Sequence, residues 1–387
     1  MSRITAVTLT AVTSPRSGIT CGHIIVQLAT DVDGLVGIGE MSDFQHLPMY
    51  HIDVRGLEAT LTDILVGRDP MESSSIAATM DRAFPSAESL YDKASLIRCG
   101  VDLAIWDLRG KLLDANVSEL LGGRSRARLP IAYPIFRQQT ESDVESNLEV
   151  MELRLQDGMS RFRVYVGRNL ELDRRFLMLA RDRFGDRIEI KSLDFSNLLD
   201  ARAAAGFIAR TAELGYEFVE APARSGDLAG LRFVRERTLV PVSEHAVGPR
   251  SALDLVTSGA VDVLNVGLFV LGGITGALRT ISVAEAAGVA CLMGTTQELS
   301  IGTAAAAHVG TCVAGPMHAS DPVGPLLYQR DVVESPVLYE DSDLVPPEGP
   351  GLGLAISDDA LAAASDDLTW RGAQLATIVD RTGEQRA

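Results

Sequence analysis

The chain has 387 residues, of which 46% are hydrophobic and only 5% aromatic. This length suits a barrel-sized domain with a smaller companion, and the composition indicates a core of Ala, Val, Leu and Ile. The formal net charge of −17 argues against nucleic acid or an anionic membrane as a partner, because both require a basic surface.

The first 60 residues have the pattern of β-strands. ITAVTLTAV and HIIVQLATD are joined by a polar link, and DVDGLVGIGE contains an Asp-Gly turn before another short strand. From residue 54 to about 123 the apolar residues recur at helical spacing, as in SLIRCGVDLAIWDLRGKLL. Strands followed by helices predict an α+β domain, which we place at residues 1–128.

Strand and helix patterns alternate after LPIAYPIF. The strand-like runs are RFRVYVG, RIEIKSLDFS, YEFVEAPA, LVPVSEHA, VDVLNVGL and VACLMGTT. Repeated alternation predicts parallel strands joined by crossover helices, and this many units suits a closed barrel better than an open sheet. We expect the barrel at residues 129–330 and a separate C-terminal segment at residues 331–387.

Polar residues end four consecutive predicted strands. Tyr165, Asp194, Glu220 and His245 follow one another at intervals of 29, 26 and 25 residues, about one strand–helix unit each. The carboxyl ends of barrel strands meet at the mouth where such barrels place their active sites. In RFRVYVG, the alternation of a strand puts Arg163 on the same face as Tyr165. We therefore expect both side chains to point into the barrel.

Neither a membrane span nor a secretion signal is expected. No apolar run is long enough to cross a bilayer, and the threonines near the N-terminus alternate as in a strand. The cysteines Cys21, Cys99, Cys291 and Cys312 lack metal-binding spacing, which favours buried, reduced thiols. These features predict a soluble, cytoplasmic protein.

Several segments resemble the mandelate racemase/muconate-lactonizing branch of the enolase superfamily, nearly end to end and in order. They are GVDLAIWDLRGKLLDANVSELLGG, the strand ends above, GGITGALRTISVAEAAGVACLMG, ELSIGTAAAAH, DPVGPL and PPEGPGLG. The resemblance implies a (β/α)7β TIM-like barrel with an N-terminal α+β capping domain, to which the C-terminal segment returns. It also implies removal of the proton α to a carboxylate, with a divalent metal stabilising the enediolate.

The resemblance places the metal ligands at the ends of the third, fourth and fifth barrel strands. Asp194 in LDFSN and Glu220 in FVEAPA match the family's carboxylates, and Mg²⁺ is the metal most expected. The third position holds His245, which is a poor ligand for a hard cation and would suit Mn²⁺ or Zn²⁺ better. Three alternatives stay open: an unusual metal, a bulge that lets Glu244 reach in, or weak metal binding.

The acid–base positions depart from the family pattern. Where many relatives have Lys-x-Lys, this chain has Arg163 and Tyr165, and the strand-six lysine is replaced by Gly267. Arg163 cannot act as a base but can bind a substrate carboxylate. Tyr165 is a candidate acid or base, or a hydrogen-bonding wall. His245 is a candidate ligand, base or packed polar residue.

Three further residues are weaker candidates. Glu298 matches a glutamate that relatives place near the substrate, or it makes a structural hydrogen bond in a loop. His46 and His51 fall in the predicted cap loop and are candidate substrate contacts. His308, in the helix after the alanine run, is expected to be structural.

The absence of a second base makes a racemase less favoured, because racemisation needs an acid–base group on each face of the α carbon. We therefore expect dehydration of a small hydroxy- or sugar acid, a lyase reaction that one group can serve. The alternatives are a racemase, epimerase or cycloisomerase of the same superfamily, or a barrel that has lost catalysis and binds a ligand. A homo-oligomer is expected from the family.

Overall fold

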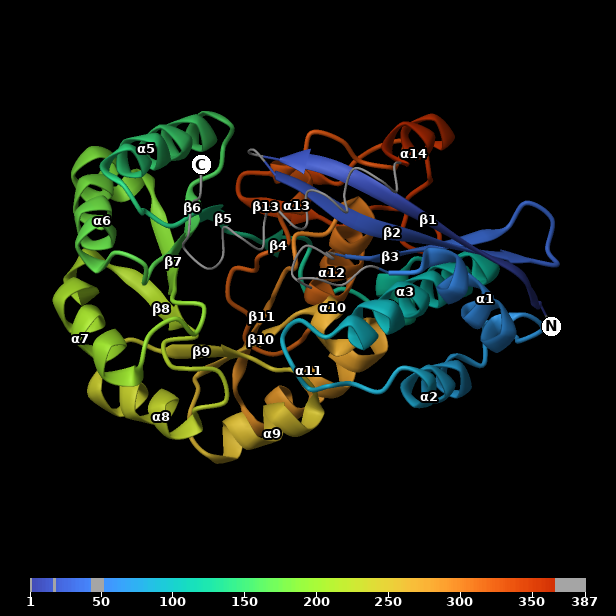
Figure 1. Ribbon diagram of the computed structural model, residues 1–387, viewed down its shortest axis with the longest axis horizontal. Helices are drawn as coiled ribbons and strands as arrows, with labels where there is room; N and C mark the ends of the chain where they lie inside the picture. The colour runs from blue at the N-terminus through green and yellow to red at the C-terminus, as the bar shows by residue number, and fades with distance from the viewer. Residues whose placement is uncertain (1, 17–18, 43–51, 366–387) are drawn as a thin grey trace.

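The computed structural model describes residues 2–16, 19–42 and 52–365. Figure 1 shows two parts, a sheet with helices α1–α3 near the N-terminus and a ring of strands enclosed by helices α5–α9. The elements are β1 (Ile4–Arg16), β2 (Ile19–Thr30), β3 (Val36–Met41), α1 (Val54–Leu65), α2 (Ser73–Ala83), α3 (Lys93–Leu113), α4 (Val117–Leu120), β4 (Leu129–Pro130), β5 (Tyr133–Ile135), α5 (Glu141–Gln156), β6 (Arg161–Tyr165), α6 (Leu170–Phe184), β7 (Glu189–Asp194), α7 (Ala201–Thr211), β8 (Tyr216–Glu220), α8 (Leu228–Arg237), β9 (Val242–His245), α9 (Pro249–Thr257), β10 (Val263–Val266), α10 (Leu268–Leu271), α11 (Ile274–Ala287), β11 (Ala290–Met293), α12 (Ser300–Cys312), α13 (Gly324–Leu327), β12 (Leu338–Glu340), β13 (Asp343–Val345) and α14 (Asp358–Ala364).

The N-terminal part is a capping domain. Strands β1, β2 and β3 form an antiparallel sheet in that order, and helix α3 packs on it. Close approach depends on Gly39, because a Cβ there would lie 2.0 Å from the carbonyl oxygen of Gly100 in α3. The helix is therefore buried along most of its length, which joins the capping domain into one core with the barrel.

The central part is a curled parallel sheet. Among the described residues, seven strands pair in the order β5 to β11, each with its sequence neighbour. The segment at residues 316–321 then hydrogen-bonds to both edges: the amide of Cys291 donates to Pro316 O at 3.0 Å, and the amide of Ala132 donates to Ser320 O at 2.9 Å. The predicted capping domain and barrel are thus both present. Asp321 lies at the end of the segment that joins the two edges.

The C-terminal segment returns to the capping domain. The amide of Val117 donates to Gly351 O at 2.9 Å, and the amide of Leu352 donates to a carboxylate oxygen of Asp107 at 2.8 Å. None of the four cysteines forms a disulfide. No helix in the described part of the chain combines the length and apolar composition that crossing a membrane requires.

Helix α12 fastens the capping domain beside the barrel mouth. The two carboxylate oxygens of Glu40 accept hydrogen bonds from the amides of Leu299 (2.8 Å) and Gly302 (2.9 Å) at the start of this helix. A carboxylate at a helix N-terminus satisfies donors that lack an intrahelical partner. These contacts fix the loop before α12, which lines the candidate site.

His308 is buried between α12, α4 and the C-terminal segment. Its Nδ1 lies 2.7 Å from Ser118 Oγ and its Nε2 lies 3.2 Å from the carbonyl oxygen of Leu352. Because that carbonyl can only accept, Nε2 carries the proton and Nδ1 accepts from the hydroxyl. Burial lowers the pKa of His308 to about 4, so the ring is neutral at physiological pH.

His308 should make the fold acid-sensitive. As the pH falls from 6.5 to 4, the unfolded chain takes up a proton at this residue before the folded chain does, so stability is lost across this range. At about 1.4 kcal/mol per pKa unit, the loss is about 3 kcal/mol. Urea unfolding of the wild type and His308→Gln at pH 7 and pH 4 checks this. The difference in the free energy of unfolding between the wild type and His308→Gln should be smaller at pH 4 than at pH 7. An equal difference at both pH values would contradict the prediction.

Candidate functional site

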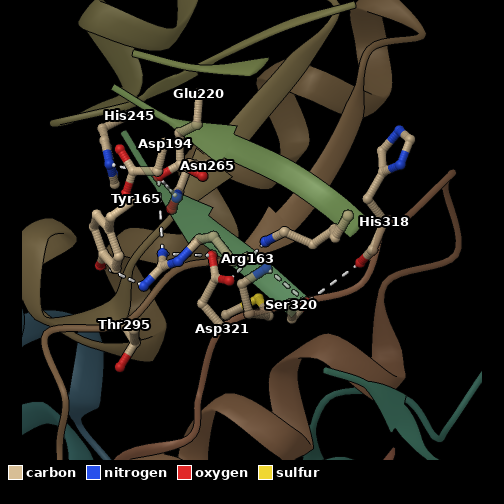
Figure 2. Close-up of polar contacts among 12 residues, drawn as sticks. Arg163, Tyr165, Asp194, Glu220, His245, Asn265, Thr295, His318, Ser320 and Asp321 are labelled. Carbon is tan, nitrogen blue, oxygen red and sulfur yellow. Dashed lines mark hydrogen bonds and ion pairs between the residues drawn. The ribbon is translucent and has the colours of Figure 1, made fainter. Parts of the chain in front are cut away.

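Consecutive barrel strands bring the four predicted strand-end residues together. In the register of the sheet, Tyr165 is beside Asp194, and Asp194 is beside Glu220. His245 ends the next strand and reaches back to Glu220 (Figure 2). All four line one cavity of about 450 Å³ at the mouth of the barrel. The spacing of the sequence and the parallel strands thus converge on a single site, as expected.

Arg163 and Tyr165 both point into the barrel, as their alternation in the strand predicted. The side chain of Arg163 is almost fully buried, and its Nη2 donates to the Tyr165 hydroxyl at 2.6 Å. The phenol ring stacks on Phe136 with centroids 5.7 Å apart and planes at 8°. Burial raises the pKa of Tyr165 above its usual value, although Arg163 opposes this. The phenol therefore keeps its proton at neutral pH.

Sequence reasoning missed two residues behind Arg163: Asp321, which contacts Arg163, and Lys191, which contacts Asp321. Asp321 Oδ2 lies 3.1 Å from Arg163 Nη1 (Figure 2). Asp321 Oδ1 accepts from Lys191 Nζ at 2.6 Å. Asp321 and Lys191 have no exposed surface. Burial alone would lower the pKa of Arg163. Asp321, Tyr165 and Glu220 outweigh this effect and raise the pKa above its usual value, so the guanidinium stays charged.

A register shift in β7 accompanies the placement of Lys191. Phe162 pairs with Ile190 but Arg163 pairs with Ser192, so one extra residue lies in β7 between these pairs. That residue is Lys191, and its ammonium group reaches Asp321. In the sequence Lys191 is one of several charged residues in RIEIKSLDFS, so no local pattern singled it out. Its partner lies 130 positions further along the chain.

Glu220 is the most crowded carboxylate of the site. Its Oε1 lies 3.1 Å from His245 Nε2, 3.2 Å from Asn265 Nδ2 and 3.9 Å from Arg163 Nη1, whereas its Oε2 is buried without a hydrogen bond. Burial opposes ionisation, but His245 and the nearby cations lower the pKa of Glu220 to about 2. Burial likewise opposes the charge of His245, yet Glu220 raises its pKa to about 9. The two therefore form an ion pair at neutral pH.

Asn265, on β10, was also missed. A Cβ at position 294 would lie 2.0 Å from its Oδ1, so Gly294, directly after the neighbouring strand β11, leaves room for the amide. The amide then reaches Glu220 and holds one of its oxygens. The sequence signal was weak, because a single asparagine in the apolar run VDVLNVGL also fits a structural hydrogen bond.

The remaining candidates do not line the cavity or fall outside the described residues. Glu244 turns away and accepts from Asn197 Nδ2 at 2.9 Å and from the amide of His245 at 2.8 Å. Glu298 accepts from Thr295 Oγ1 at 2.8 Å, and burial raises its pKa to about 7. Its hydrogen bonds organise the loop before α12. His46 and His51 lie outside the residues that the structure describes.

The arrangement of donors does not fit a divalent cation. In the described ranges, no group of three or more His, Cys, Asp or Glu side chains is placed to hold a metal ion. Asp194 Oδ1 accepts from the amide of Ser196 at 2.7 Å and from its hydroxyl at 2.9 Å. Glu220 Oε1 is shared by three nitrogens, which leaves only Oε2 of that carboxylate without a hydrogen bond. The third position supplies an imidazole engaged with Glu220. Hard cations need several unengaged oxygen ligands.

Family models match both parts of the chain. The model described as mandelate racemase/muconate lactonizing enzyme, N-terminal domain, matches residues 4–122. The model described as enolase C-terminal domain-like matches residues 147–360. The second match alone covers more than half of the chain.

Individual proteins are similar over most of their length. A chloromuconate cycloisomerase from Pseudomonas sp. (strain P51) is 30% identical over 344 residues, which cover 87% of this chain and 90% of that protein. An N-succinyl-L-Arg/Lys racemase from Bacillus cereus is 27% identical and covers 87% of this chain and 89% of its own length. The structure of muconate lactonizing enzyme from Pseudomonas putida superposes with a TM-score of 0.83 at 24% identity, covering 94% of this chain and all of that one, which supports the fold.

Proposed function

Because the chain belongs to the mandelate racemase/muconate lactonizing enzyme family of the enolase superfamily, we propose that it is a cycloisomerase. Its substrate would be a small unsaturated dicarboxylate of the muconate type, which it would close into a lactone. The similarity to chloromuconate cycloisomerases supports this substrate class.

The position of Tyr165 carries the proposal. Its hydroxyl lines the cavity and receives a hydrogen bond from the permanently charged Arg163. A phenol holds its proton at neutral pH, so Tyr165 is suited to donate a proton rather than to remove one. Cycloisomerisation ends with protonation of an enolate, whereas dehydration and racemisation begin with proton removal. The dehydration expected from the sequence therefore has less support than ring closure.

The proposed reaction uses one acid. One carboxylate oxygen of the substrate adds to the carbon β to the other carboxylate, and the electron pair of the double bond moves onto the α carbon and its carboxylate. Tyr165 then gives its proton to the α carbon, and solvent returns a proton to the phenolate, which Arg163 stabilises. The dianion becomes a monoanionic lactone with uptake of one proton, and nothing is oxidised or reduced.

The lining of the cavity supports a one-acid reaction. Gly267 and Val270 line the part of the cavity formed by the end of β10 and the start of α10, and neither can transfer a proton. A racemase needs acid–base groups on both faces of the α carbon, and the family's lysine at the Gly267 position is missing. Of the reactions known among similar proteins, ring closure needs the fewest acid–base groups.

Substrate consumption can test the proposal directly. Purified full-length protein is incubated in D₂O with cis,cis-muconate, with 3-chloromuconate and with a panel of hydroxy- and sugar acids. We expect loss of the diene's ultraviolet absorbance and one deuterium at the α carbon of the lactone, measured by NMR. Dehydration of a hydroxy acid without diene consumption would replace the proposal with a lyase. No turnover of any compound would indicate a non-catalytic barrel.

A further inference from the structure

Enzymes of this family use a divalent metal, generally Mg²⁺ or Mn²⁺. We propose that in this chain the guanidinium of Arg163 carries the positive charge that receives the substrate carboxylate, and that the ligand binds without a metal ion. The proposal rests on the proposed function only for the class of ligand, a dicarboxylate.

The first support is the state of the two carboxylates that would bind a metal. Asp194 Oδ1 and Glu220 Oε1 already have protein donors, and His245 Nε2 and Arg163 Nη1 lie 3.1 and 3.9 Å from Glu220 Oε1. A divalent cation in contact with Glu220 would lie close to the charge of Arg163 and be repelled by it. Arg163 therefore already supplies a permanent positive charge beside Glu220.

The second support is the way Arg163 is fixed. Its Nη1 is held by Asp321 at 3.1 Å, its Nη2 by the Tyr165 hydroxyl at 2.6 Å, and the side chain is almost fully buried while still lining the cavity. A guanidinium is charged at every physiological pH and presents donors whose geometry matches a carboxylate. A fixed cation at the floor of a cavity is a preorganised anion site.

The third support is the neutralisation of Asp321 from its other side. Lys191 Nζ contacts Asp321 Oδ1 at 2.6 Å, and both side chains have no exposed surface. Because Lys191 occupies one oxygen of Asp321, the other oxygen remains for Arg163. Lys191 and Asp321 are thus positioning residues, which act on the ligand through Arg163.

Metal binding is the first test. The full chain is stripped with EDTA and titrated with Mn²⁺ by calorimetry and electron paramagnetic resonance. We expect no saturable binding by the wild type. His245→Asp places a carboxylate at the third ligand position, and binding by this variant shows that the assay detects such a site. Stoichiometric Mn²⁺ binding by the wild type that is lost in Asp194→Asn would overturn the proposal.

Ligand binding is the second test. The probe is adipate, a saturated dicarboxylate that cannot react, and its Kd is measured by calorimetry in EDTA and in excess Mn²⁺. We expect equal affinity in both, and a loss of about tenfold or more in Arg163→Gln, with a smaller loss in Arg163→Lys. Binding that requires Mn²⁺, binding that is unchanged in Arg163→Gln, or no binding in either condition each counts against the proposal.

The positioning role has its own comparison. Lys191→Met should weaken adipate binding, whereas Lys191→Arg, which retains the charge, should restore much of the affinity. Thermal unfolding identifies variants that have lost the fold. Equal adipate affinity in folded Lys191→Met and the wild type would remove Lys191 from the anion site.

The outcomes separate this proposal from the proposed function. If no muconate is consumed but adipate binds in EDTA and depends on Arg163, the reaction is wrong and the anion site stands. If muconates are consumed only with Mn²⁺, the reaction stands and the metal-free site is wrong.

Discussion

Replacing Tyr165 with phenylalanine is expected to lower kcat for muconate cyclisation by about 10²- to 10⁴-fold, the usual contribution of a general acid. The substitution removes only the hydroxyl that accepts from Arg163 at 2.6 Å. The ring can still stack on Phe136, so the fold should be retained. Adipate affinity should fall far less than in Arg163→Gln, because Arg163 keeps its charge and its contact with Asp321. Steady-state kinetics and calorimetry on the same preparations measure both effects.

Tyr216→Phe is a matched control for this prediction. The Tyr216 hydroxyl also makes a hydrogen bond, to Thr211 Oγ1 at 3.0 Å, but Tyr216 does not line the cavity. This variant should keep the kcat of the wild type. If Tyr165→Phe also keeps it, the phenol is not the proton donor. If it loses adipate affinity with an unchanged kcat, Tyr165 has a binding role instead.

Removing one partner of the buried Lys191–Asp321 pair should be the most destabilising change in the barrel. Lys191→Met is expected to lower the free energy of unfolding by about 3–5 kcal/mol, because it leaves part of a buried carboxylate uncompensated. Asp321→Leu should cost more, because it leaves both Lys191 and Arg163 without their shared counter-ion. Urea unfolding at pH 7 measures both losses.

An exposed ion pair provides the comparison. Arg232 and Glu236 lie 2.7 Å apart on the surface of α8, with more than half of each side chain exposed. Arg232→Met should change stability by less than about 1 kcal/mol, because water and salt screen such pairs. The prediction fails if Lys191→Met is as mild as this control. In that case water or a shift of Arg163 would neutralise the charge of Asp321 in Lys191→Met.

Much of the candidate site could be predicted from local patterns. Alternation in β6 placed Arg163 and Tyr165 on one face, and regular spacing placed Asp194 and Glu220 at neighbouring strand ends. The sequence left His245 and Glu244 as alternatives, and the structure places only His245 in the cavity. These inferences needed only the period of a strand and the parallel order of a barrel.

Other parts of the site could not be predicted in this way. Lys191 reaches Asp321 from a stretch of β7 that holds one extra residue, and strict alternation does not anticipate such a shift. Asn265 could be assigned to Glu220 only once Gly294 was seen to leave space beside it. The homo-oligomer stays a prediction from the family resemblance, whereas the arrangement of the described side chains does not support the metal site that the resemblance implied.

The sequence by itself determined the architecture and the set of charged groups at the barrel mouth, because periodicity and strand order are properties of short stretches of chain. Only the tertiary structure decided which charges neutralise each other. Lys191 and Asp321 are 130 positions apart, and their separation of 2.6 Å depends on the segment at residues 316–321 hydrogen-bonding to both edges of the sheet. Electrostatic energy depends on such distances in space, which no local pattern specifies.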